Sequence, residues 1–346
     1  MARSGAFYSV AVSLSNFCPM FAIHYRKIFL TIALVLTIAS LAIVAFLGLK
    51  PGIDFSGGSL TEVVYGEVPS KDTVKEAVTK LNLGEFSVQE AVDETGRNGY
   101  LVRTRDLSES ERVSLSETVT SLGNEGEVTR FTTIGPVMGK ELRDKALWAV
   151  AGVVLVIVLY VAFAFAGIGK PVSSWIYGSV TILVLLFDVL IPTAMVSILG
   201  HIYGVEADVL FVMALLAILG LSVNNSIVIF DRVRENLVRN RTEKRTRKVE
   251  AGVVREEVEY TITKPFDEIV GESISQTMAR SINTSLTVLL ALFALYFVGG
   301  EVTKVFALTL IAGVIAGTFS AICTASPLLV VYSKWQEKKQ AGVQNK

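Results

Sequence analysis

The sequence predicts a polytopic α-helical membrane protein with six transmembrane helices and one ferredoxin-like α+β domain, of order βαββαβ, between helices one and two. Three observations lead to this fold class. First, 51% of the 346 residues are hydrophobic and only 18% are charged, which is typical of polytopic membrane proteins. Second, several apolar runs are close to or above the ~20 residues that cross a bilayer. Third, one long polar stretch separates the first two runs.

Six apolar runs form the predicted spans, at residues 28–49, 147–168, 175–199, 208–230, 282–298 and 305–332. The first run is too long for a signal peptide, and no small-x-small cleavage site precedes Lys50, so we expect an uncleaved anchor. Gly169-Lys170-Pro171 is the expected break between spans two and three. An even number of spans places both chain ends on one side of the membrane.

Residues 50–144 form the predicted soluble domain and hold 17 acidic against 11 basic residues. The patterning predicts strands at 59–65, 86–92, 100–104 and 128–134. Ser70 is expected to cap a first helix whose apolar face runs to Leu81, and a second helix is expected at 108–122. This order is that of the ferredoxin-like superfold, which by itself says little about function.

Basic residues predict the orientation. Between Arg232 and Lys248 there are eight Lys and Arg against two Glu, so the positive-inside rule makes this connection cytoplasmic. A nucleic-acid or lipid-headgroup patch is the alternative interpretation. The apolar spacing in 262–278 predicts an amphipathic helix lying on the membrane. The expected order is a cytoplasmic N-terminus (1–27), span one (28–49), the extracytoplasmic domain (50–144), a five-helix bundle (145–333) with a basic cytoplasmic loop (231–279), and a cytoplasmic tail (334–346).

Several function classes lack their motifs. Cys18 and Cys323 are the only cysteines and neither lies in the soluble domain, which excludes a disulfide framework or a four-cysteine zinc site. The sequence has no Walker A loop, no H-E-x-x-H and no G-x-S-x-G motif. We therefore expect no enzymatic activity, no cofactor and no metal.

Asp188 lies near the middle of the third span. An ionised side chain at that depth costs at least ~3 kcal/mol, so it usually faces a bundle interior and marks an ion or proton path. Pro192 removes the backbone hydrogen bond that the Asp188 carbonyl would accept, which predicts a kink. The alternative is a structural Asp bonded to a neighbouring helix.

Two further polar groups enter the predicted spans. Span four carries a serine and two amides, Ser222, Asn224 and Asn225. Paired amides in a membrane need partners from another helix. Span five opens with three polar residues on one helical face, Arg280, Thr284 and Thr287. Arg280 either snorkels to the cytoplasmic surface or is a functional cation set against the amides and Asp188; the spacing leaves both open.

Several separated motifs resemble the SecD/SecF family of protein-export membrane proteins. Gly52-Ile53-Asp54-Phe55-Ser56-Gly57-Gly58 is similar to the family signature G-[IV]-D-F-x-G-G, and Asp188 matches the Asp of the third span. Residues 222–236 resemble the fourth-span motif, whose cytoplasmic part here includes Asp231, Arg232, Arg234 and Glu235. Residues 275–280 match the segment that ends in the family's intramembrane Arg. The small single insert agrees with the SecF branch rather than with SecD.

The resemblance implies a non-enzymatic auxiliary subunit of the Sec preprotein translocase in the bacterial inner membrane. The implied partners are SecD, the SecYEG channel, SecA, YajC and YidC, with unfolded preprotein as substrate, the lipid bilayer around the chain, and no nucleic acid. After SecA-driven translocation, the proton-motive force is expected to drive ectodomain movements that prevent backsliding. A small-molecule exporter of the resistance-nodulation-division type is the rival, and six spans with one small insert count against it.

Position 225 departs from the family pattern, which has Asp where this chain has Asn. An amide cannot bind and release a proton near neutral pH. Three mechanisms are then open: proton transfer by Asp188 with Arg280 as a changeable partner, coupling by SecD with this chain as a structural partner, or sodium coupling through neutral oxygens. We prefer the first.

Gly57 and Gly58 are expected to allow a positive φ at a rigid joint after span one, where Asp54 bonds local amides.

Overall fold

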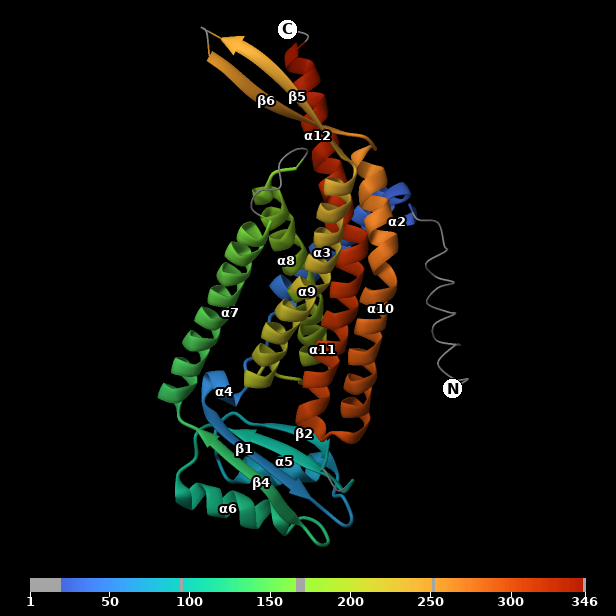
Figure 1. Cartoon of the computed structure of the whole chain (residues 1–346). Helices are drawn as coiled ribbons and strands as arrows, with labels where there is room; N and C mark the ends of the chain where they lie inside the picture. The colour runs from blue at the N-terminus through green and yellow to red at the C-terminus, as the bar shows by residue number, and fades with distance from the viewer. Residues whose placement is uncertain (1–19, 94–95, 166–171, 251–252, 345–346) are drawn as a thin grey trace, which may run out of the picture.

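The computed structural model describes residues 20–93, 96–165, 172–250 and 253–344. Long helices form a bundle with a small sheet domain at one end and a two-stranded hairpin and the C-terminal helix at the other (Figure 1). Within the described ranges, six helices are long and apolar enough to cross a membrane. The six helices and the small sheet domain after the first of them confirm the coarse architecture predicted from the sequence.

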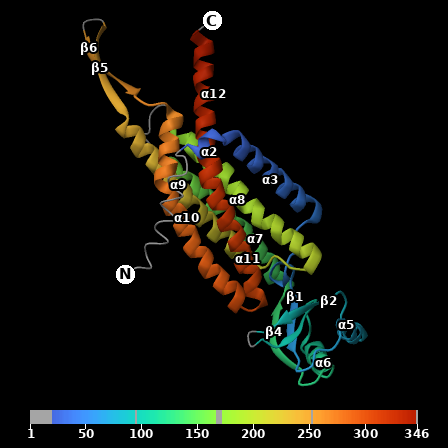
Figure 2. The same cartoon turned by 90° about the vertical axis from the view of Figure 1, so that its right-hand side faces the viewer.

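The first five spans are single helices, α3 (Arg26–Leu47), α7 (Pro136–Ala164), α8 (Ser174–Tyr203), α9 (Val209–Arg239) and α10 (Phe266–Val298). The sixth consists of α11 (Glu301–Ser320), a π-helical turn η1 (Ala321–Ala325) and α12 (Ser326–Gln344). A short helix, α2 (Phe21–His24), precedes α3. α11 contacts α8, α9 and α10, and α3 packs along α8 at one side of the bundle (Figure 2). The sixth span therefore forms the centre of the bundle.

The sheet domain contains β1 (Gly58–Val64), α5 (Lys71–Lys80), β2 (Ser87–Val92), β3 (Asn98–Thr104), α6 (Glu109–Thr120) and β4 (Glu127–Ile134). Its strands are antiparallel, in the order β2-β3-β1-β4. A short helix, α4 (Ile53–Ser56), joins span one to β1. The core is formed by fully buried aliphatic residues of the sheet and both helices, among them Val63, Val74, Val102, Leu115 and Val119.

Local sequence signals explain the two helices of this domain. The predicted cap is confirmed, since the Ser70 hydroxyl accepts a hydrogen bond from the Thr73 amide at 3.2 Å. Ser108 and Glu111 form a reciprocal capping box at the start of α6. Such caps satisfy amides that have no partner within the helix, so the helix starts can be predicted from single residues.

Some predicted boundaries differ from the structure. α7 begins at Pro136, so the second span starts as a helix well before its apolar run and continues directly from the last strand. Span three remains helical through Pro192. The predicted break at 169–171, the N-terminal stretch 1–19 and Thr95 in the predicted hairpin turn lie outside the described residues.

The prediction of a surface-lying amphipathic helix at 262–278 is wrong. The residues from Phe266 onward are the first turns of α10, which runs unbroken to Val298. Its apolar face, with Ile269 and Val270, is buried in the main core of the bundle instead of in lipid. Apolar spacing identifies a buried face but not what covers it.

The predicted basic loop 231–279 is also largely regular structure. It contains the end of α9, the hairpin β5 (Arg241–Glu250) and β6 (Val253–Ile262), and the start of α10. The strand register sets Lys244 opposite Glu259 and Arg247 opposite Glu256. The charged segment therefore pairs with itself as two antiparallel strands.

Candidate functional site

Asp188 lies in the interior of the bundle, as the cost of an exposed charge predicts, and is 0% exposed. The Ser222 hydroxyl of α9 donates a hydrogen bond to Oδ2 of this α8 carboxylate. Oδ1 has no hydrogen-bond partner among the described residues. The Ser320 hydroxyl at the end of α11 also lies close to the carboxylate, while it donates to the Gly317 carbonyl at 3.1 Å. Three helices therefore meet at Asp188.

Helix geometry is irregular next to this carboxylate. The π-helical turn η1 starts directly after Ser320 and contacts α3, α8 and α9. Such turns inside α-helices occur frequently at functional sites. The buried hydroxyls of Ser226 and Thr324 have no hydrogen-bond partner among the described residues. A buried hydroxyl without a protein partner is a usual position for bound water.

A cavity of about 20 Å³ lies between α9, α10 and α11 and shares Ser222 with the Asp188 hydrogen bond. Its polar lining is neutral and consists of Ser222, Asn224, Asn225, Thr284 and Ser285. A water molecule needs roughly 10–15 Å³ of such volume and two or more polar partners. The cavity therefore has room for water, one hydroxyl away from the carboxylate.

The predicted residues of span five are exposed on α10, and one of them also reaches the cavity. Arg280, Thr284 and Thr287 are all exposed, and Thr284 lines the cavity as well. The Thr287 hydroxyl donates to the Thr284 carbonyl within the helix at 2.8 Å. Among the described residues, Arg280 forms no ion pair with Asp188. The structure thus assembles Asp188 and the span-four residues, and it leaves Arg280 on the surface of the single chain.

The predicted joint after span one has the expected backbone. Gly57 has φ +77°, and a Cβ there would lie 2.8 Å from the Pro136 Cα, so this position requires glycine. Gly58 has φ +139°, and a Cβ there would lie 2.6 Å from the Thr104 carbonyl oxygen. Gly52 precedes the short helix α4, which contains both Asp54 and Phe55 and packs against α7.

Asp54 bonds a distant amide rather than the local ones that we expected. Its Oδ2 accepts the backbone N–H of Val209, the first residue of α9, at 2.9 Å. The N-cap residue Asp208 accepts the Phe211 N–H at 2.8 Å. Two carboxylates therefore stabilise one helix N-terminus, where the helix dipole favours negative charge. The Gly52 amide donates to the Ala207 carbonyl at 2.7 Å and extends this contact.

The sheet domain also contacts the segment that connects α8 to α9. Gln89 Nε2 of β2 donates to the Gly204 carbonyl at 2.7 Å, and Arg103 of β3 forms a mostly buried ion pair with Glu206. Burial lowers the pKa of Arg103 to about 10, against the raising effect of Asp208 and Asp54. We call these contacts to residues 204–209 the latch. Sequence reasoning missed it because the contacts join residues about 100 or more positions apart.

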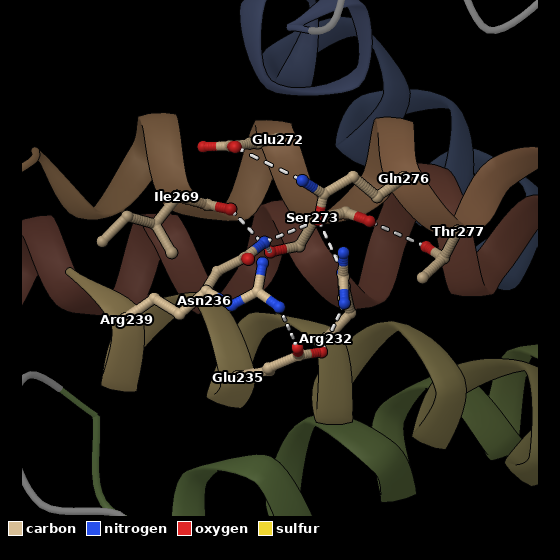
Figure 3. A network of polar contacts seen from close by, with 9 residues as sticks. All are labelled: Arg232, Glu235, Asn236, Arg239, Ile269, Glu272, Ser273, Gln276 and Thr277. Carbon is tan, nitrogen blue, oxygen red and sulfur yellow. Dashed lines mark hydrogen bonds and ion pairs between the residues drawn. The ribbon is translucent and has the colours of Figure 1, made fainter.

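The predicted cytoplasmic motif fastens α9 to α10 (Figure 3). Arg232 forms an ion pair with Glu235 and donates from Nε to Gln276 Oε1 at 2.6 Å. Asn236, which the site prediction omitted, is buried and donates to Ser273 Oγ at 2.8 Å and to Gln276 Oε1 at 2.9 Å. Asp231 and Arg234 are exposed. Within the described residues no group of three His, Cys, Asp or Glu side chains is arranged to hold a metal ion.

A family profile described as protein export membrane protein SecD/SecF, C-terminal, matches residues 114–253 and 249–335. The chain is 34% identical over 324 residues to the protein translocase subunit SecF of Thermobaculum terrenum, covering 91% of this chain and 94% of that protein. The SecF subunit of Anaerolinea thermophila is also 34% identical, with 92% and 96% covered. The crystal structure of SecDF, a translocon-associated membrane protein from Thermus thermophilus, matches with 30% identity and a TM-score of 0.73, covering 90% of this chain and 38% of that one. The chain belongs to the SecD/SecF family of protein-export membrane proteins.

Proposed function

We propose that this chain is the SecF-type subunit of a Sec preprotein translocase and uses proton movement through its bundle to move its sheet domain. The names of its relatives support the export role. A relative named SecDF, of which this chain covers 41%, supports SecD as the partner. The strand order and the two helices support a ferredoxin-like assignment for the sheet domain. The remaining partners, SecYEG, SecA, YajC and YidC, follow from the family alone.

The buried carboxylate of Asp188 carries this proposal. It is enclosed by protein, and one of its oxygens has no hydrogen-bond partner among the described residues. A buried carboxylate with an unsatisfied oxygen is costly when ionised, and a proton relieves that cost. Taking up and losing a proton therefore changes the free energy of this site more than the same event on the surface. That difference is what an ion-driven movement requires.

The small cavity supports a route by which the proton reaches Asp188. Water between Asn225 and Thr284 would contact Ser222, whose hydroxyl already donates to the carboxylate. Asn225 then orients water and does not itself carry the proton. The exposed face with Arg280 and Thr287 is the surface on which we expect SecD to pack, so Arg280 acts at that interface.

The latch supports a way to convert the protonation of Asp188 into motion of the sheet domain. α8 carries Asp188 and α9 carries Ser222, and the connection between these two helices is bonded to the sheet domain through Gln89 and Arg103. A shift of α8 against α9 therefore pulls on β2 and β3 directly. The positive-inside rule sets the hairpin end of the bundle in the cytoplasm and the sheet domain outside. Both chain ends are then cytoplasmic, in the inner membrane.

The test is export by membrane vesicles that contain the translocase, SecD and this chain. Asp188→Asn is expected to abolish the part of export that an uncoupler inhibits, while Asp188→Glu retains some of it. Thr309→Val serves as a control, because its buried hydroxyl donates within its own helix. Unchanged uncoupler-sensitive export by Asp188→Asn would remove Asp188 from the relay and leave SecD as the coupling subunit.

Two further outcomes would favour sodium coupling or a different transported substrate. Export that responds to the removal of sodium but not to an uncoupler would support a cation bound by the neutral oxygens of the cavity. Drug transport by the chain alone, without SecD, would support a small-molecule exporter. Co-purification with SecD in mild detergent is the expected result, and its failure would contradict the proposed partnership.

A further inference from the structure

A cavity of about 430 Å³ lies at the end of the bundle away from the sheet domain, where α2, α3, α10 and α12 meet. Its charged lining comes from three of these elements: Arg26, Lys27, Asp267 and Lys334. Its apolar lining includes Ile23 and Ile28. The volume is within the ~300–1,000 Å³ of ordinary ligand sites. The cavity has both a charged and an apolar wall, and the relay described above does not use it.

The charges in this cavity are unbalanced. The Lys334 ammonium pairs with the Asp267 carboxylate, and Arg26 lies close enough to interact with the same carboxylate. Since the lining holds three cations and one carboxylate, an excess of two positive charges remains. An ammonium has three donors, so the ion pair leaves Lys334 able to bind a second acceptor.

The flanking segments of the chain offer little negative charge to this cavity. Residues 1–19 contain no Asp or Glu. After Lys334 the sequence contains one acid, Glu337, followed by three lysines. Glu337 lines a neighbouring cavity, which contains the same Asp267–Lys334 pair. The missing negative charge is therefore expected from a ligand.

The position of the cavity indicates what kind of anion this is. Arg26 is the first residue of span one, so the cavity lies at the level where a span meets the headgroup region. Ile28 belongs to the cavity lining and begins an exposed ridge that continues along α3 through Ile32 and Val35. Residues at this spacing share one helix face. A cationic site thus continues into an exposed apolar ridge that runs toward the membrane interior.

We propose that this cavity binds the headgroup of an anionic phospholipid. Arg26, Lys27 and Lys334 hold the phosphate, and one acyl chain lies along Ile28, Ile32 and Val35. Basic pockets between transmembrane helices on the cytoplasmic side bind such headgroups, and guanidinium groups match phosphate oxygens in pairs. A zwitterionic lipid fits less well, because its own cation enters a site that already has an excess of positive charge.

Native mass spectrometry of the full chain with equal amounts of phosphatidylglycerol and phosphatidylcholine tests the proposal. We expect phosphatidylglycerol to be retained preferentially. The double variant Arg26→Gln with Lys334→Gln is expected to bind it on the order of tenfold or more weakly, since each surface cation contributes severalfold. The matched control is Lys338→Gln with Lys339→Gln, which removes two exposed charges from the same end of the molecule.

A gain-of-function variant covers the case in which the double variant fails to fold. Asp267→Asn raises the excess charge of the cavity by one and is expected to increase phosphatidylglycerol retention severalfold. Weaker retention by Asp267→Asn, equal retention of both lipids, or an equal loss in the matched control would each overturn the proposal.

The source of the phosphate is tested separately. Millimolar inorganic phosphate, added to the lipid-free protein, is expected to leave its thermal unfolding temperature unchanged, while phosphatidylglycerol raises it. If inorganic phosphate alone raises the unfolding temperature, and Arg26→Gln removes that increase, the site binds free phosphate and the lipid assignment is wrong.

Discussion

Ser222 of α9 donates a hydrogen bond to the carboxylate of Asp188 in α8, and both side chains are enclosed by protein. The connection between the same two helices is bonded to the sheet domain by the latch. The hydrogen bond between Ser222 and Asp188 therefore joins α8 to α9 at the proposed site of protonation. Changes in the charge of Asp188 act first on the packing of α8 against α9, and through it on the sheet domain.

Ser222→Ala is expected to destabilise the protein by about 1–3 kcal/mol, because a buried carboxylate oxygen loses its donor. Ser226→Ala, one helical turn further along α9, is the matched control. The Ser226 hydroxyl is buried without a hydrogen-bond partner among the described residues, so its removal is expected to be neutral or slightly stabilising. Thermal unfolding in detergent measures both variants, and equal losses would contradict a specific role for the Ser222 bond.

Asn225→Asp is expected to be tolerated, because it replaces the side-chain amide with a carboxyl group of nearly the same shape in a polar cavity. The sharper experiment combines it with Asp188→Asn. If the cavity and the carboxylate belong to one route, Asn225→Asp restores part of the uncoupler-sensitive export that Asp188→Asn has lost. Asn283→Asp, an exposed amide of α10 that does not line the cavity, is not expected to restore it. Complete loss of export by Asn225→Asp alone would show that the site has another chemistry.

The predictable parts of this molecule are those that depend on neighbouring residues. The Ser70 cap, the positive φ of Gly57 and the burial of Asp188 follow from local backbone demands or from the cost of a charge in lipid. The partner of Asp188 could not be predicted, because it depends on how α8 is rotated against α9. Arg280 shows the same limit, since its helical face was predicted but not what that face contacts.

The hairpin β5–β6 and the start of α10 show a second limit. Charge density suggested a loop at 231–279, and periodic apolar residues suggested a surface helix. In the structure the first segment is a two-stranded antiparallel hairpin, and the second is buried in the bundle. In both cases the pattern was real, and tertiary contacts decided which surface it meets.

Removing Arg103 or Glu206 is expected to loosen the latch. Two charged side chains in contact typically couple by about 0.5–3 kcal/mol, so a double-mutant cycle with Arg103→Met and Glu206→Gln should give a coupling energy in that range. Amide hydrogen exchange at residues 204–209 is expected to accelerate in each variant. The exposed Arg112–Glu109 pair is the control, and we expect no measurable change there. A coupling energy near zero would remove the Arg103–Glu206 pair from the latch.

Alkaline pH is expected to destabilise the sheet domain through Tyr65. Burial raises the pKa of Tyr65 from 10.0 to about 12, and its hydroxyl donates to the Val119 carbonyl at 2.8 Å. Because the folded state holds this proton more tightly than the unfolded state, the stabilisation is complete below pH 10 and is lost as pH rises toward 12. Hydrogen exchange of the domain between these values measures the loss. Tyr65→Phe is less stable at neutral pH and is expected to show a weaker dependence on alkaline pH.

Asn236 is expected to determine how firmly α9 and α10 are joined. Its amide donates to Ser273 and to Gln276, and it is almost fully buried. Asn236→Asp keeps the shape but replaces a donor with a charged acceptor that faces two oxygens, so it is expected to lower stability more than Asn236→Ala. Arg234→Ala, in the same motif but exposed, is the control and should leave the unfolding temperature unchanged. If Asn236→Asp is no worse than Asn236→Ala, the Gln276 amide has rotated to donate, and the network is adaptable rather than rigid.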